Sequence, residues 1–295
     1  MRILYDVVRD GLTSINQAAD ELAAARAQVS SGRRITTASD DPIGAQQAVG
    51  EHATLGAIDA YSRSRDAAAA RLAAADSLLS SFGDKLTAAI VAGLGARGSA
   101  VSASARAAAS AAVAGLRESL LADINSDFNG TYLFSGTRSD TPAYALVGGV
   151  WTYQGDASAT QVEVERGRLV SVTFDGRQIA QGDDADNVFA VLDALVAAID
   201  AGDDAAIGDA TAALERALDR ALRAQGRLGA DERGVDDAAI RLSTLRRAAD
   251  TRRSALEDVN LADAITRMAD AETAYRAALG AVSSAERLSL LDYLR

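Results

Sequence analysis

The sequence contains no cysteine, two prolines and one histidine among its 295 residues, and aromatic residues make up only 4% of it. The absence of cysteine excludes disulfides, thiolate catalysis and cysteine-ligated metal sites. Because proline is so rare, little in the chain interrupts a helix. Alanine runs such as Ala67–Ala70 add strong helix formers. The composition therefore predicts a helix-rich protein.

The charge balance is acidic, with a net charge of -11. Proteins that bind nucleic acid through its phosphates usually present a basic face, so this balance argues against that role. The chain has no apolar run of about 20 residues, the length that a membrane-spanning helix needs. Its first residues, Met1 to Asp6, carry charges where a signal peptide needs an apolar segment of about 7 to 15 residues. We expect no membrane insertion and no signal-peptide route.

Apolar residues recur every seven positions at the beginning of the chain. They are Val8, Ile15, Leu22 and Val29, with Leu12 and Ala19 at the intermediate positions. This spacing predicts a coiled-coil helix. The helix should end at Gly32, where glycine can take the left-handed conformation. A second helix should begin at Asp41-Pro42, because aspartate caps free amides and proline suits the first helical position.

Helical spacing continues to the glycines around Gly93-Gly95, and a third helix is predicted up to Asn129-Gly130. From about Thr131 the apolar period changes to two, which predicts strands. Three hairpin turns are expected, at Gly148-Gly149, Arg166-Gly167 and Asp175-Gly176. We expect these strands to close on one another and not on the helices.

Helical spacing resumes near Asn187. The acidic stretch Asp183 to Asn187 before this helix, and Asp203-Asp204 before the next one, are expected to cap helix ends. The longest predicted helix carries apolar residues from Val235 through Val259 and Ile265 to Val282, without a break. The predicted fold is mainly α, a long antiparallel helical rod with terminal coiled-coil tails and a small inserted antiparallel β domain. Its domains are residues 1–40 with 260–295 (terminal assembly), 41–130 with 187–259 (helical rod) and 131–186 (β insert).

Two segments at opposite ends of the chain resemble the flagellins and their relatives at the hook-filament junction. The first includes Ser30-Ser31-Gly32-Arg33-Arg34-Ile35 and Ala38-Ser39-Asp40-Asp41-Pro42. The second runs from Ala255 to Thr266 and continues through Glu272-Thr273-Ala274-Tyr275 to Leu294. Asp40-Asp41-Pro42 and the segment Thr131-Tyr132-Leu133-Phe134-Ser135-Gly136 resemble the junction branch more than the filament flagellins.

The resemblance implies a structural, non-enzymatic subunit of the bacterial flagellum, an adaptor required for filament assembly, with a filament-forming flagellin as the alternative. It further implies export through the flagellar channel and four partners: other copies in a ring, the first hook-associated protein, flagellin and an export chaperone. No cofactor or metal is expected. The expected assembly interface comprises Val8, Leu12, Ile15, Leu22, Val29, Arg33, Arg34, Leu279, Val282, Leu288, Leu291 and Leu294.

Other kinds of site are weaker hypotheses. His52 is the only histidine and is expected to be an ordinary surface residue. The acidic stretch Asp183 to Asn187 lacks the glycine and distal glutamate of an EF-hand loop, which favours helix capping over calcium binding. Trp151 and the tyrosines are expected in a small core more than on a carbohydrate-binding face. An unrelated coiled-coil binding module would leave both terminal segments unexplained.

Overall fold

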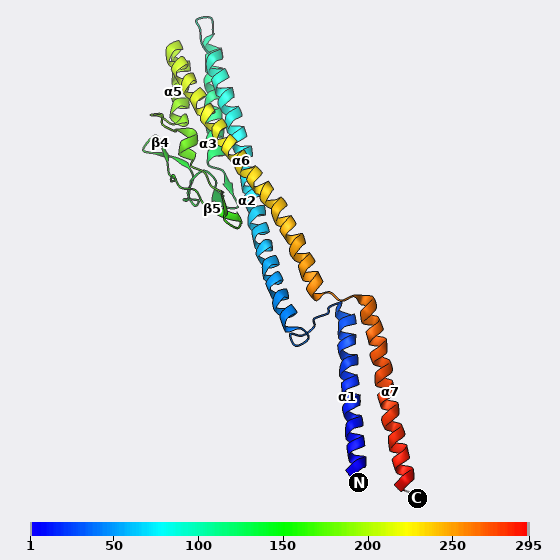
Figure 1. The fold of residues 1–295 in the computed structure, drawn as a ribbon. Coiled ribbons are helices and arrows are strands. Elements are labelled where there is room, and N and C mark those ends of the chain that lie inside the picture. Colours follow the sequence, from blue (N-terminus) through cyan, green and yellow to red (C-terminus); the bar gives the residue numbers. More distant parts are fainter. Residues whose placement is uncertain (1, 294–295) are drawn as a thin grey trace. The chain divides into compact units, whose positions relative to one another are not determined.

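The computed structural model describes the backbone of residues 2–293 and the side chains of residues 9–284. It is mainly α-helical with small antiparallel sheets, which confirms the predicted fold class (Figure 1). The helices are α1 (Arg2–Ser31), α2 (Pro42–Gly95), α3 (Ala103–Ile124), α4 (Gly176–Ala180), α5 (Val188–Ala201), α6 (Asp204–Glu257) and α7 (Leu261–Tyr293). By their contacts the residues form two units: unit 1 holds 1–58 and 244–295, and unit 2 holds 59–243.

Unit 1 contains the two terminal helices, α1 and α7, which run side by side in opposite directions (Figure 1). Near one end of the pair Gly11 faces Val282, so closely that a Cβ on Gly11 would lie 2.7 Å from a Val282 methyl carbon. Near the other end Arg33 and Asp258 form an antiparallel bridge. The two terminal helices, predicted as coiled-coil tails, therefore pair with each other within a single chain.

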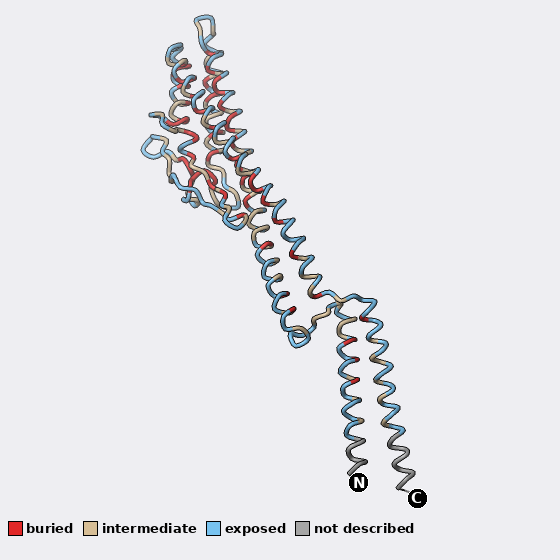
Figure 2. Tube along the Cα trace, in the orientation of Figure 1, coloured by how far each residue is buried: buried red, intermediate tan, exposed pale blue. Residues whose placement is uncertain are grey.

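Unit 2 is built on the α2 and α6 segments that lie within it, which pack antiparallel. The Gln225 side chain donates to Asp76 at 3.1 Å, and further along the pair Gly93 packs against Thr211. Helices α3 and α5 pack on each other in the same unit. The buried residues gather here (Figure 2). Small side chains at Gly93 and Ala89 let neighbouring helices come close, as helix packing requires.

Three hairpins follow α3. They pair β1 (Asp127–Phe128) with β2 (Thr131–Tyr132), β3 (Tyr144–Val147) with β4 (Val150–Tyr153), and β5 (Gln161–Glu165) with β6 (Arg168–Ser171). The turns at Gly148-Gly149 and Arg166-Gly167 are where the sequence predicts them. Both Gly148 and Gly149 have positive φ, which glycine adopts without steric cost.

The strands do not close only on one another, so that prediction was wrong. Phe134, Tyr144 and Val164 belong to the same buried cluster as residues of α2, α3, α5 and α6. The Arg71 side chain of α2 also donates to the Val172 carbonyl at 2.7 Å. Three separate two-stranded sheets have too little apolar surface to be stable alone, so they bury it against the helices. The three-domain division drawn from the sequence remains a proposal.

Several predicted boundaries differ from the structure. Helix α3 ends at Ile124, because the Asn125 side chain leaves the helix and pairs with both backbone groups of Tyr144 at 2.8 Å. Asp175-Gly176 is not a hairpin turn. Asp175 instead caps α4 by accepting the N–H of Arg177 at 2.9 Å. The helix predicted to run without a break from Val235 to Val282 is interrupted: α6 extends from Asp204 to Glu257, and α7 begins at Leu261.

Candidate assembly interface

The seam between α1 and α7 is lined mostly by small side chains. Ala18, Leu22 and Ala25 are the buried residues of α1, and Ala264 is buried on α7. The spacing of Ala18, Leu22 and Ala25 confirms helical heptad packing. However, the intermediate positions of the seam are Ala18 and Ala25, not the predicted Leu12 and Ala19. Leu12 is 53% exposed. The register follows the alanines because they allow a closer approach of the two helices.

Of the predicted interface residues, Arg33 is exposed and Arg34 is half-buried, and the ten apolar ones fall into four groups. Leu22 is buried, Ile15, Val29 and Val282 are half-buried, Leu12 and Leu279 are exposed, and the side chains of Val8, Leu288, Leu291 and Leu294 lie outside the described residues. The buried and half-buried residues stabilise the α1–α7 pair. Leu12 and Leu279 stay exposed beside the pair, and their part in an assembly interface stays a prediction.

The structure adds exposed apolar residues of unit 1 that sequence reasoning did not assign to an interface. They are Ile43 and Val49 on α2, Leu245 on α6, and Leu261 and Ile265 on α7, which are between 47% and 71% exposed. Contiguous apolar patches mark faces that another protein covers, whereas apolar residues scattered singly are normal on a protein surface. Ile43 and Val49 could not be found from periodicity, because they lie off the buried stripe of α2.

The segment between α1 and α2 is fixed to the end of α6 by Arg34. Its Nη2 donates to the Leu256 carbonyl at 2.9 Å and to the Asp41 carboxylate at 3.0 Å. The Arg34 N–H also donates to the Glu257 carbonyl at 2.6 Å, and the Val259 N–H donates to Gly32 at 3.0 Å. These backbone bonds explain why α6 stops at Glu257, although the sequence contains no proline or glycine there.

The two aspartates of this segment hold it in shape. Asp40 accepts hydrogen bonds from the backbone N–H groups of Thr37 and Thr36 and from both hydroxyls, which lowers the Asp40 pKa well below its ordinary range. Asp41 accepts the Gly44 N–H at 2.9 Å as the cap of α2, and this bond together with Arg34 lowers the pKa of Asp41. The predicted cap is confirmed, and both groups are charged at neutral pH.

His52 and Glu257 form a contact that the sequence did not indicate. Glu257 is 7% exposed, and its carboxylate lies 2.7 Å from the His52 Nε2 and 3.5 Å from an Arg253 nitrogen. His52 itself is 47% exposed, so it lies on the surface as predicted but is not an ordinary surface residue. Nearby, Arg252 binds Glu51 at 2.7 Å. These pairs join the first turns of α2 to the last turns of α6.

The other candidate sites have structural roles. Asn187 caps α5 by accepting the N–H groups of Phe189 and Ala190 at 3.1 Å. Asp184 is paired with Arg220 and Arg216. Among the described residues, no group of three or more histidine and acidic side chains could hold a metal ion. Nor is any helix of the described part long and apolar enough to cross a membrane.

Fold and site together define a class of protein: a chain of long antiparallel helices whose two ends pair, with hairpins inserted in the middle and apolar side chains exposed at the paired ends. Two family descriptions match this chain, the bacterial flagellin N-terminal helical region over residues 9–139 and the bacterial flagellin C-terminal helical region over residues 211–294. The chain belongs to the flagellin family.

Within the family, the chain is similar to flagellar hook-associated protein 3 of two bacteria. It is 28% identical to the Escherichia coli protein over 183 residues and 29% identical to the Salmonella typhimurium protein over 185 residues. Each alignment covers 58% of this chain and 58% of the relative. The matched part therefore spans little more than half the length of these curated relatives.

Solved structures have the same fold. A putative flagellar hook-associated protein from Vibrio parahaemolyticus superposes with a TM-score of 0.71 at 21% identity, covering 74% of this chain and 99% of that one. Flagellar hook-associated protein-3 from Legionella pneumophila gives a TM-score of 0.64 at 14% identity, covering 70% and 98%.

Proposed function

We propose that this chain is a structural, non-enzymatic subunit of the bacterial flagellum that serves as an adaptor at the junction of hook and filament. The observation that carries the proposal is the match of both ends to the flagellin helical regions together with relatives named flagellar hook-associated protein 3. Asp40-Asp41-Pro42 and the entry into the hairpins at Thr131–Gly136 support the junction branch of the family.

The proposed mechanism is assembly through the α1–α7 pair, which packs against neighbouring subunits that surround it. Its own seam buries mostly alanine, which removes little apolar surface from water. Leu12, Ile265 and Leu279 remain about half exposed, and covering the exposed half of each by neighbouring chains would contribute about 1 kcal/mol. The proposed neighbours are other copies of this chain in a ring, the first hook-associated protein on one side and flagellin on the other.

Export through the flagellum's own channel and binding of a dedicated chaperone before export belong to the same proposal. A paired terminus held by so few large side chains can open at modest cost, which suits passage as an extended chain. The proposed location is the hook-filament junction outside the cell.

Deletion of the gene provides the main test. The adaptor role requires that the deletion strain keeps its hooks and still exports flagellin, but carries no attached filaments in electron micrographs. Normal attached filaments would contradict the proposal. Complementation with a Leu12→Glu, Leu279→Glu variant should fail, because charges would lie on the face that neighbours cover. An Asn16→Glu variant is the matched control, since Asn16 is an exposed polar residue of the same helix.

The alternative, a filament-forming flagellin, predicts that the purified protein polymerises alone into filaments when seeded. An adaptor should remain monomeric or form only small oligomers under those conditions. Light scattering of the seeded protein distinguishes the two functions, and long filaments would favour the alternative.

A further inference from the structure

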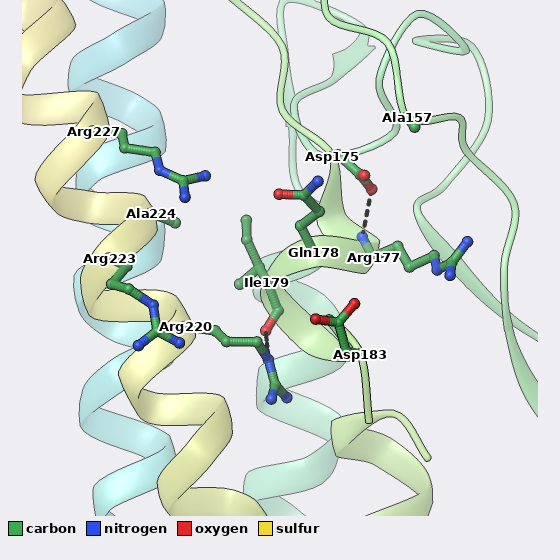
Figure 3. Close-up of a pocket in the computed structure, with 11 residues that line it drawn as sticks. Ala157, Asp175, Arg177, Gln178, Ile179, Asp183, Arg220, Arg223, Ala224 and Arg227 are labelled. Carbon is green, nitrogen blue, oxygen red and sulfur yellow. Dashed lines mark hydrogen bonds between the residues drawn. The ribbon is translucent and has the colours of Figure 1, made fainter. Parts of the chain in front are cut away.

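A hollow of about 420 Å³ lies in unit 2 between α6 and the segment that contains α4 (Figure 3). Arginines dominate its lining, and two aspartates accompany them. The charged residues are Arg177, Arg220, Arg223, Arg227, Asp175 and Asp183. The chain as a whole has a net charge of -11, but the lining of this hollow is basic, because it holds four arginines and only two aspartates. It lies outside unit 1, which holds the proposed assembly element.

The arginines differ in whether they already have partners. Arg220 donates to the Asp184 carboxylate at 2.6 Å and to the Ile179 carbonyl at 3.3 Å, so it is structural. Among the described residues, the guanidinium groups of Arg223 and Arg227 have no hydrogen-bond or ion-pair partner. Asp175 is occupied as the cap of α4. Figure 3 shows Arg177 pointing away from α6, which leaves Arg223 and Arg227 as the free cations that border the hollow on its helical side.

The hollow continues along α6 toward Leu228 and Asp231. A second hollow of about 260 Å³ shares six lining residues with it, including Ala224, Ile179 and Arg227, and continues to Leu228 and Asp231. The floor is partly apolar, from Ile179 and Leu228, and the far end is acidic at Asp231. The two hollows together form a groove with one basic end, which we name the arginine groove.

The spacing of the free arginines favours an extended chain over a single small ion. Arg223 and Arg227 are four residues apart on a helix, which corresponds to about 6 Å along the axis. Figure 3 shows their guanidinium groups following one another along α6 and not converging on one point. In an extended peptide, alternate side chains are about 6.6 Å apart. Carboxylates at every second position would therefore meet the two arginines in turn.

We propose that the arginine groove binds an acidic peptide segment of another protein chain, with carboxylates on alternate residues. Guanidinium groups bind carboxylates through two parallel hydrogen bonds, so each arginine can hold one acidic side chain. The apolar floor at Ile179 and Leu228 receives the small side chains between them. The binding site stands on unit 2 alone and does not depend on the flagellar role.

The test measures fluorescence anisotropy of a labelled peptide of alternating Asp and Ala, added to the full-length protein at low salt. We expect saturable binding that weakens as salt is raised, and no binding of the peptide in which Asn replaces Asp. The Arg223→Glu, Arg227→Glu variant should bind about tenfold more weakly or worse. The fold should persist, since neither side chain has a partner to lose, and circular dichroism with Trp151 fluorescence checks this.

The matched control is Arg233→Glu, Arg247→Glu, which reverses two exposed arginines of the same helix outside the groove. It should bind the peptide almost as well as the unaltered protein. Equal loss of binding in both variants, or equal binding of the Asp and Asn peptides, would overturn the proposal. So would complete displacement of the peptide by inorganic phosphate at equal concentration, because the site would then be one for small anions. Self-association at low salt that only the groove variant abolishes would support it, with a second copy supplying the acidic segment.

Discussion

Asp193 on α5 is a single residue that joins three elements of unit 2. Its carboxylate accepts the Trp151 Nε1–H of β4 at 2.9 Å and a hydrogen bond from Arg117 of α3. The Trp151 ring packs on Phe189 with ring centroids 5.8 Å apart. The hairpin β3–β4 is thus held by one charged group above an aromatic contact.

Replacing Asp193 by Ala should release the indole and leave Arg117 without this partner. We expect a loss of about 1 kcal/mol, less than the usual range for hydrogen bonds to charged groups, because Asp193 is partly exposed. Trp151 is the only tryptophan, so its fluorescence reports this site directly. Its emission should shift to longer wavelength, and unchanged emission together with an unchanged urea midpoint would refute the assigned role.

In unit 1, Glu257 is likewise a carboxylate that contacts two side chains, those of His52 and Arg253. Glu257→Ala removes the buried partner of His52 and Arg253, and we expect a cost of about 1 to 3 kcal/mol to the contacts at the end of α6. Hydrogen exchange of the Arg34 and Val259 amides should accelerate, while the unfolding midpoint seen by Trp151 should not move. Glu51→Ala, which breaks a more exposed pair with Arg252, is the control and should change exchange less.

Asp40 makes the segment between α1 and α2 sensitive to acid. A carboxyl group whose pKa is lowered on folding stabilises the folded state above its unfolded pKa and loses this effect as pH falls through the folded pKa. Because the Asp40 pKa is lowered from its ordinary value of 3.8, protection of the Thr36 and Thr37 amides should be equal at pH 5 and pH 7 and fall only below about pH 4. Asp40→Asn should remove that protection at every pH. Protection in the variant equal to that of the unaltered protein would show that the carboxylate is not needed.

For the terminal helices α1 and α7, the free energy gained by burial is small relative to the entropy cost of ordering the helices, because their seam is mostly alanine. Ordering a residue costs about 1 to 2 kcal/mol in backbone entropy, and alanine burial returns little of it. We therefore expect limited proteolysis of the purified protein to cut α1 and α7 first and to leave unit 2 intact. Gly11→Leu should speed this cleavage, since even a Cβ at that position would press on Val282.

Gly280→Leu is the control on α7, because no atom lies within 4 Å of a Cβ placed there. Its cleavage should match that of the unaltered protein. If the terminal helices resist protease as long as unit 2 does, the α1–α7 pair is stable without neighbouring chains.

Among the elements, those set by local chemistry could be predicted from the sequence. The Asp41-Pro42 cap of α2, the Asn187 cap of α5 and two glycine hairpins depend on neighbouring residues, and they lie where expected. The break after Glu257 could not be predicted, since bonds from Gly32 and Arg34, more than 200 residues away, cause it.

In the candidate sites too, features set by neighbouring residues could be predicted, and features set by residues far apart in sequence could not. Heptad spacing predicted a coiled-coil helix at the beginning of the chain, but the intermediate seam positions are Ala18 and Ala25 and not the predicted Leu12 and Ala19. Arg220, Arg223 and Arg227 have the spacing of one helix face in the sequence. Their groove could not be predicted, because its opposite wall comes from α4, which the sequence suggested to be a turn.

For the whole molecule, unit 2 is expected to be a self-sufficient fold, because its buried cluster lies within residues 59–243. A chain of residues 59–243 should unfold in urea with a Trp151 transition at the same midpoint as in the full-length protein. A midpoint lower by more than about 1 M, roughly 1 to 3 kcal/mol, would show that unit 1 contributes to the stability of unit 2.

The pairing of α1 with α7 also fixes an order of events during synthesis. Unit 1 is made from the first and last parts of the chain, so its contacts join residues such as Gly11 and Val282 that lie far apart in sequence. Such non-local contacts form slowly, because a long loop must close first. Folding of unit 2 shortens that loop, since the antiparallel α2 and α6 segments bring its two ends together. Until α7 is made, α1 lacks the helix with which it pairs, and its alanine and leucine face is open to any protein that meets the nascent chain.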